Sequence, residues 1–79
     1  MTEIVQGAED VRVQRSRMLI QHALFELTVE QGFAAVTVRD IARRAQINRS
    51  TFYRHYLDKY DVLNQYLDQL QADVADAAL

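Results

Sequence analysis

Residues 49–56 constrain the fold and the chemistry of this chain more than any other segment. Placed on a helix at about 100° per residue, Phe52 and Tyr56 point one way. Ser50 and Arg54 point the opposite way, so one face of the predicted helix is apolar and the other is polar and basic. Such a helix needs a hydrophobic partner for its aromatic face and offers its other face to a polar, anionic surface.

A second short helix is predicted directly upstream, over residues 38–45. Its apolar residues form one compact face, made of Val38, Ile41, Ala42 and Ala45. Two short helices separated only by residues 46–48 have the spacing of a helix-turn-helix, whose second helix enters a groove of DNA. The pair therefore predicts a DNA-binding motif.

Three helix starts share one capping pattern, a short polar residue followed three positions later by a polar partner. The side-chain oxygen of each first residue can accept a backbone N–H of the first turn, which otherwise has no partner in the helix. The three pairs are Thr37 with Asp40, Asn48 with Thr51, and Asp58 with Asp61.

The composition favours helix, because the chain has two glycines and no proline, and the residues that punctuate sheets and turns are almost absent. Gly32 is placed to end the first helix with a left-handed residue. The predicted fold class is all-α, a three-helix bundle with a helix-turn-helix plus a long fourth connecting helix. The predicted helices span residues 11–31, 38–45, 49–56 and 59–79.

We expect three parts along the chain. Residues 1–10 have no helical period and are expected to form a flexible N-terminal arm, and residues 11–57 form the helix-turn-helix domain. Residues 58–79 start a helix whose apolar stripe runs for about 30 Å, at about 1.5 Å per residue. Two short helices cannot cover that length, so we expect this helix to lead to a C-terminal domain that is missing from the sequence.

The charge distribution favours an anionic partner, although the formal net charge is −2. All nine Lys and Arg residues lie between residues 12 and 59, where only four acids occur. A phosphate backbone responds to the local field, since charges are screened beyond about 8 to 10 Å. No apolar run approaches the roughly 20 residues of a membrane span, and there is no cysteine. We expect a cytoplasmic protein that does not enter a membrane.

The polar face of the 49–56 helix carries residue types that read DNA. Arginine pairs with guanine through two hydrogen bonds, hydroxyls donate and accept, and a threonine methyl contacts thymine. The candidates for base contacts are Arg49, Ser50, Thr51 and Arg54. The candidates for phosphate contacts are Tyr53, His55 and Lys59. The competing interpretation is an ordinary solvated helix face.

Several of these segments also resemble a known family. Residues 32–33, 37–42, 48–56 and 58–59 are similar to the N-terminal domain of TetR-family bacterial transcriptional regulators, and the resemblance covers about residues 17–67. It implies the same base and phosphate contacts, with Thr51 added to the phosphate set and with Phe52 and Tyr56 in the core. It further implies that Thr37 caps its helix against the DNA backbone and that Arg39 reaches the groove.

The resemblance implies further partners as well. It implies a C-terminal domain that binds a small-molecule ligand and forms a homodimer, so that the full-length protein is a repressor whose binding to double-stranded DNA is relieved by the ligand. Gln46 stands where the family usually places a turn glycine. Either this turn holds a non-glycine residue in the left-handed conformation, at a cost of about 1 kcal/mol, or it adopts another geometry.

Two other classes of function compete with DNA binding. A helical protein-interaction module or an anti-repressor could use the same fold and direct its arginine-rich face at an acidic protein. We do not expect an enzyme, because two distant histidines, no cysteine and no glycine-rich loop offer no nucleophile, general base or phosphate cradle. His22 has no partner at ligand spacing, so no metal and no other cofactor is expected.

Overall fold

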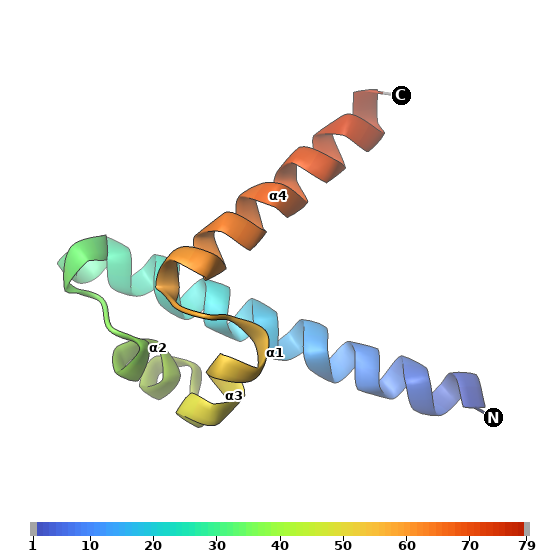
Figure 1. The fold of residues 1–79 in the computed structure, drawn as a ribbon, viewed down its shortest axis with the longest axis horizontal. Coiled ribbons are helices and arrows are strands. Elements are labelled where there is room, and N and C mark those ends of the chain that lie inside the picture. The colour runs from blue at the N-terminus through green and yellow to red at the C-terminus, as the bar shows by residue number, and fades with distance from the viewer. Residues whose placement is uncertain (1, 79) are drawn as a thin grey trace.

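The computed structural model describes the backbone of residues 2–78 and the side chains of residues 10–74. Within this part the chain is all-α, as predicted, with no strand (Figure 1). The α2 boundaries match the predicted residues, α3 ends one residue earlier than predicted, and α4 starts at the predicted residue. In chain order the elements are α1 (Thr2–Gln31), the 3-10 helix η1 (Phe33–Ala35), α2 (Val38–Ala45), α3 (Arg49–His55) and α4 (Lys59–Ala78).

Helix α1 begins at Thr2, upstream of the predicted start at residue 11. The expected flexible arm, residues 1–10, lies almost entirely outside the residues whose side chains the structure describes, and it stays a prediction. At its other end α1 stops at Gln31, because Gly32 follows with φ 85° and donates its N–H to the carbonyl of Thr28 at 2.9 Å. The prediction that Gly32 ends this helix with a positive φ is confirmed.

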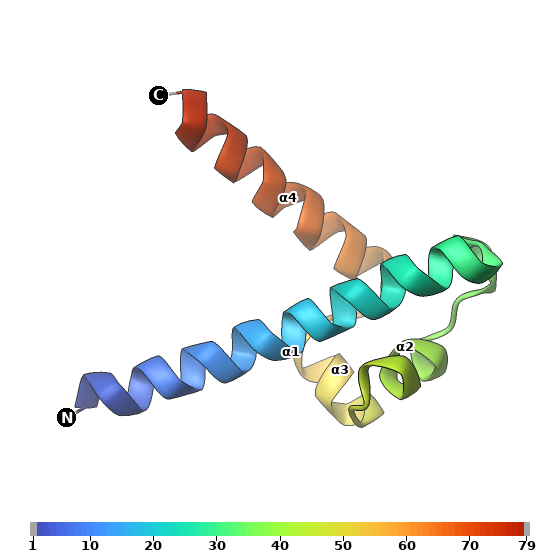
Figure 2. The same cartoon turned by 180° about the vertical axis from the view of Figure 1, so that it is seen from behind.

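The helices lie on two sides of α1. Helices α2 and α3 pack beside the C-terminal half of α1, whereas α4 starts next to α1 and then runs away from the α2–α3 pair (Figures 1 and 2). The views from front and back agree on this arrangement. The helix-turn-helix therefore lies at one edge of the molecule, and the end of α4 projects from the other side.

One hydrophobic core joins the four α-helices. An apolar stripe of α1 is buried and meets the apolar faces of α2 and α3 together with one valine of α4. The stripe consists of Ile20, Ala23, Leu24 and Leu27. Burying large apolar side chains removes them from water and is the main favourable contribution to folding in a chain this short. The largest fully buried side chains are Phe52, Ile20, Leu24, Ile41, Val36 and Val62.

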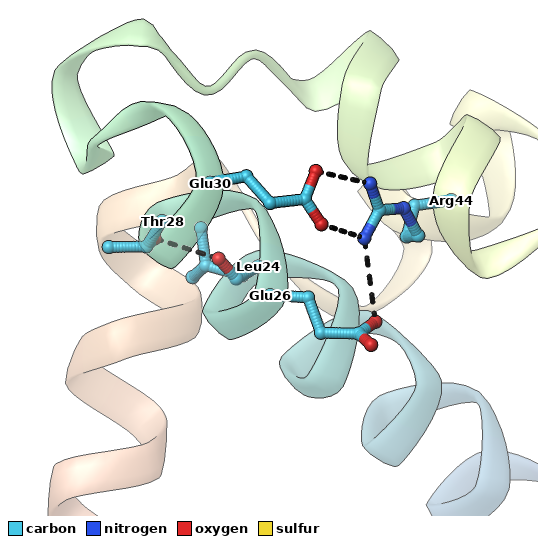
Figure 3. Close-up of polar contacts among 5 residues, drawn as sticks. All are labelled: Leu24, Glu26, Thr28, Glu30 and Arg44. Carbon is cyan, nitrogen blue, oxygen red and sulfur yellow. Dashed lines mark hydrogen bonds and ion pairs between the residues drawn. The ribbon is translucent and has the colours of Figure 1, made fainter.

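A cluster of charges fixes the end of α2 to the last turns of α1 (Figure 3). The Arg44 guanidinium donates from both terminal nitrogens to the two carboxylate oxygens of Glu30, each at 2.7 Å, and lies 3.8 Å from Glu26. The hydrogen bond from Arg44 lowers the pKa of Glu30. Thr28 of the same helix donates its hydroxyl to the Leu24 carbonyl at 2.7 Å. The two-point contact orients α2 against α1 at an exposed site.

Two of the three predicted helix caps are confirmed. Thr37 accepts the N–H of Asp40 at 3.1 Å, and the Asp40 carboxylate accepts the N–H of Thr37 at 3.2 Å, which completes a capping box. Asp58 accepts the N–H of Asp61 at 2.8 Å.

The predicted Asn48 cap is wrong, because the Asn48 side chain makes no capping hydrogen bond. Its backbone carbonyl instead accepts the N–H groups of Thr51 and Phe52, at 3.0 and 3.2 Å. Asn48 is exposed, so water can satisfy the remaining N–H groups of the first turn in place of a side chain.

The turn between α2 and α3 depends on Gln46, which adopts the left-handed conformation with φ 60° and ψ 44°. Of the two alternatives predicted for this turn, the structure therefore shows the left-handed residue. Gln46 donates its N–H to the Arg43 carbonyl at 3.2 Å, and Ile47 donates to the Ala42 carbonyl at 3.0 Å. These are the two hydrogen bonds of a Schellman motif, which ends α2 and turns the chain into α3.

Replacing Gln46 with glycine should stabilise the protein. The substitution Gln46→Gly removes the steric cost of the left-handed residue, and this gain exceeds the extra entropy of glycine in the unfolded chain by about 0.5–1 kcal/mol. Urea denaturation followed by circular dichroism measures the change. The matched control Gln46→Ala keeps the strained conformation and should give no such gain; equal stabilities of the two variants would contradict the assignment of strain.

Candidate nucleic-acid interface

The orientation of α3 is set by two aromatic side chains. Phe52 and Tyr56 are buried, with 0% and 2% of their surface exposed, and their ring centroids are 5.8 Å apart. The Tyr56 hydroxyl accepts hydrogen bonds from Arg17 and Gln21 of α1, each at 3.4 Å. Since these contacts fix the inner face of α3, the opposite face is held toward solvent.

The outer face of α3 carries most of the predicted site residues. Arg49, Ser50, Tyr53 and Arg54 are exposed, whereas Thr51 and His55 are partly buried. The Tyr53 ring packs edge-on against Phe52, with centroids 5.3 Å apart, while 55% of the surface of Tyr53 stays exposed. The four exposed side chains therefore lie on the accessible surface of α3, whereas Thr51 and His55 lie at its partly buried margins. The individual contacts of all six residues with DNA stay predictions.

Helix α2 contributes a basic hollow beside the start of α3. Its lining side chains come from both helices and are Arg39, Ala42, Arg43, Ile47, Asn48 and Arg49. Three guanidinium groups around one shallow depression create a local positive potential that suits phosphate or a base edge. Arg43 and Asn48 were not among the predicted site residues, although the spacing of four residues between Arg39 and Arg43 already indicates a shared helical face.

Thr37 lies exposed at the N-terminus of α2, which its hydroxyl group caps. Its oxygen accepts the N–H of Asp40, and a hydroxyl group can donate at the same time as it accepts. The hydrogen bond from the backbone N–H of Thr37, followed by that from its hydroxyl, lowers the pKa of Asp40. Gln31 adds a third hydrogen bond to this carboxylate at 3.3 Å. The Asp40 carboxylate, in the first turn of α2, is thus already engaged by Thr37 and Gln31.

Lys59, the last predicted phosphate ligand, has contacts inside the protein. Its ammonium group donates to the backbone carbonyls of Phe33, Ala34 and Val36 at 2.7, 3.3 and 2.8 Å. The sequence pattern gave no signal for these contacts, because the partners are backbone atoms more than twenty residues away.

His55 occupies a partly buried position at the end of α3. Burial, followed by the positive charges of Arg17 and Arg54, lowers the pKa of His55. Its backbone carbonyl accepts a hydrogen bond from Gln65 of α4 at 3.5 Å. A neutral histidine is therefore favoured in the folded protein, at the point where α1, α3 and α4 meet.

Comparison with known proteins identifies the family. Residues 20–66 match the family described as "Bacterial regulatory proteins, tetR family". This stretch includes all of η1, α2 and α3. The chain belongs to the TetR family. The match covers the helix-turn-helix formed by α2 and α3.

One relative is considerably longer than this chain. The chain is 37% identical over 68 residues to the "Uncharacterized HTH-type transcriptional regulator YxbF" of Bacillus subtilis (strain 168). The alignment covers 85% of this chain but only 18% of the relative. No solved structure matches the chain.

Two further properties concern the part of the chain that the structure describes. There, none of the helices has the combination of length and apolar character that a membrane crossing requires. In the same residues, no group of three or more His, Cys, Asp or Glu side chains is arranged to hold a metal ion.

The low pKa of His55 predicts a pH-dependent stability. The unfolded chain takes up the proton near the ordinary histidine pKa of about 6.5, whereas the folded protein takes it up only at lower pH. The free energy of unfolding is therefore fully present above that value and falls as the pH drops toward the lowered pKa. Denaturant titrations between about pH 8 and pH 5 should show this loss, and His55→Gln should reduce it.

His22→Gln is the matched control for the change of residue type, because His22 is exposed on α1. A loss of stability with falling pH that persists in His55→Gln and disappears in His22→Gln would contradict the assignment to His55.

Proposed function

We propose that this chain is the sequence-specific reading head of a repressor that binds double-stranded DNA. The observation that supports this most is the geometry of α3. Phe52 and Tyr56 are buried against α1, and the basic and hydroxyl face of α3 is exposed beside the arginine-lined hollow of α2. Such an arrangement suits a recognition helix that enters the major groove while the preceding helix lies across the backbone.

The proposed base contacts come from side chains that are long and charged or short and hydroxylated. Arginine at a major-groove edge discriminates guanine by about 1–3 kcal/mol for each good pair of hydrogen bonds, and hydroxyls adapt to several bases. The residues proposed for this role are Arg39, Arg49, Ser50, Thr51 and Arg54.

The proposed phosphate contacts come from the margins of the two helices. Thr37 at the start of α2 and Tyr53 on α3 are exposed donors, and His55 lies at the end of α3 beside Arg54. Contacts of this kind set the register on the duplex without reading its sequence. We do not place Lys59 in this set, because its donors are already occupied by backbone carbonyls.

We further propose that a longer protein contains this head. The chain spans 18% of the length of its matched relative, and the exposed apolar residues Leu67, Leu70 and Val74 of α4 lie near the end of the described chain. The remaining part would bind a small-molecule ligand and form a homodimer in the cytoplasm. Two heads would then read half-sites about 34 Å apart, one turn of DNA, or multiples of that distance, and the ligand would change their separation.

A DNA-binding titration with the full-length protein tests this function. An operator is first selected from random duplexes, and its affinity is then measured by fluorescence anisotropy at several salt concentrations. Affinity should fall steeply with salt, with a slope of log K against log salt of about −0.9 for each phosphate contacted. Binding that is independent of salt, or a preference for acidic protein over any duplex, would favour the protein-interaction alternative.

Single substitutions separate the two kinds of contact. Tyr53→Ala should weaken binding to all sequences about equally, whereas Arg49→Ala and Arg54→Ala should also relax the preference at one base pair by about 1–3 kcal/mol. The selection experiment repeated with each variant measures this preference. Arg15→Ala is the charge-matched control, since Arg15 is exposed on α1 away from its buried stripe. An equal effect of Arg15→Ala would remove the support for a specific α3 interface.

A further inference from the structure

Lys59 is the only lysine in the chain, and all of its donors are used within the protein. An ammonium group has three N–H donors and no acceptor. In the structure these donors meet three backbone carbonyls, those of Phe33 at 2.7 Å, Ala34 at 3.3 Å and Val36 at 2.8 Å. The carbonyls belong to η1 and to the residue that follows it, so one side chain holds the whole connection between α1 and α2.

Two aromatic rings enclose this ammonium group. Its nitrogen lies 4.7 Å from the centroid of the Phe33 ring and 5.7 Å from that of Tyr60. The two rings pack edge-on with centroids 5.3 Å apart. A cation in this position gains attraction from the rings in addition to its hydrogen bonds. To reach a phosphate, Lys59 would have to give up both kinds of contact.

The segment that Lys59 holds leads directly into the predicted interface. Val36, whose carbonyl binds the ammonium group, is followed by Thr37, which caps α2 and is a proposed phosphate contact. Arg39 lies in the first turn of the same helix and lines the basic hollow. A displacement of the segment would therefore move the start of α2 and the side chains that it presents.

We propose that Lys59 is a positioning residue for DNA binding and does not itself contact phosphate. It fixes the connection between α1 and α2 to the first residue of α4, and it acts on DNA through Thr37 and Arg39. Because Lys59 begins α4, the same contact links any displacement of α4 to the start of α2. This role rests on the proposed DNA-binding function and replaces the phosphate contact expected for Lys59.

The salt dependence of DNA binding distinguishes the two roles. Lys59→Met keeps the length and the apolar packing of the side chain but removes the donors and the charge. A positioning role predicts affinity about tenfold lower at every salt concentration, with an unchanged slope of log K against log salt, because no phosphate contact is lost. Arg43→Met, in the basic hollow, is the control for a lost phosphate contact, and its slope should be shallower by about 0.9.

Lys59→Arg adds a second comparison. Arginine keeps the charge, but its planar guanidinium cannot direct three donors at carbonyls grouped around one point. A positioning role predicts that Lys59→Arg binds DNA as weakly as Lys59→Met. Recovery of affinity in Lys59→Arg, a slope for Lys59→Met shallower by about 0.9, or unchanged affinity in both variants would each overturn the proposal.

The wild-type protein provides a test that does not depend on the folding of a variant. With ¹⁵N-labelled lysine, the single side-chain ammonium gives one NMR signal. Held by three carbonyls, it should exchange slowly with water in the free protein and shift little when duplex DNA is added. Rapid exchange in the free protein, or a large shift with coupling to phosphorus in the complex, would overturn the proposal. A wild-type protein that binds no duplex overturns the proposed function, whereas the free-protein signal still decides the Lys59 contact.

Discussion

The burial of Phe52 and Tyr56 is the constraint on which the rest of the structure depends. Both rings belong to one core cluster with Ile20 and Leu24 of α1. Helix α3 has only seven residues, fewer than an isolated helix needs in water, so it persists because its aromatic face packs on α1. Since that packing fixes the rotation of α3, it also determines which side chains face solvent.

Polar contacts around this core set the orientation of the helices. Arg44 pairs with Glu30 between α2 and α1, and Arg17 of α1 donates to Gln65 of α4 at 2.8 Å. Exposed or partly buried pairs of this kind add little net stability compared with the core, because water competes for both partners. Their directional geometry is what selects one arrangement of α2 and α4 against α1. Lys59 performs the same task for the connection between α1 and α2.

The sequence allowed good prediction wherever the deciding interactions are local. The boundaries of α2 follow from the Thr37 capping box and from an apolar period within eight residues, and both could be read from neighbouring positions. The left-handed Gln46 was predictable for the same reason, since a Schellman turn places one positive-φ residue at a fixed offset. The predicted Asn48 cap was wrong, because an exposed side chain can hydrogen-bond to water in place of the helix N-terminus. Sequence spacing does not reveal this alternative partner.

The sequence by itself determined the all-α fold class, the burial of Phe52 and Tyr56, and the polar, basic character of the opposite face of α3, because each depends on a period of a few residues. Only the tertiary structure decided that Arg43 shares a hollow with Arg49 and that Lys59 turns inward to the carbonyls of Phe33 and Val36. Those contacts join segments distant along the chain, and two of the partners are backbone oxygens that every residue carries. Side-chain identity therefore indicated that Lys59 is a cation, and packing determined what it binds.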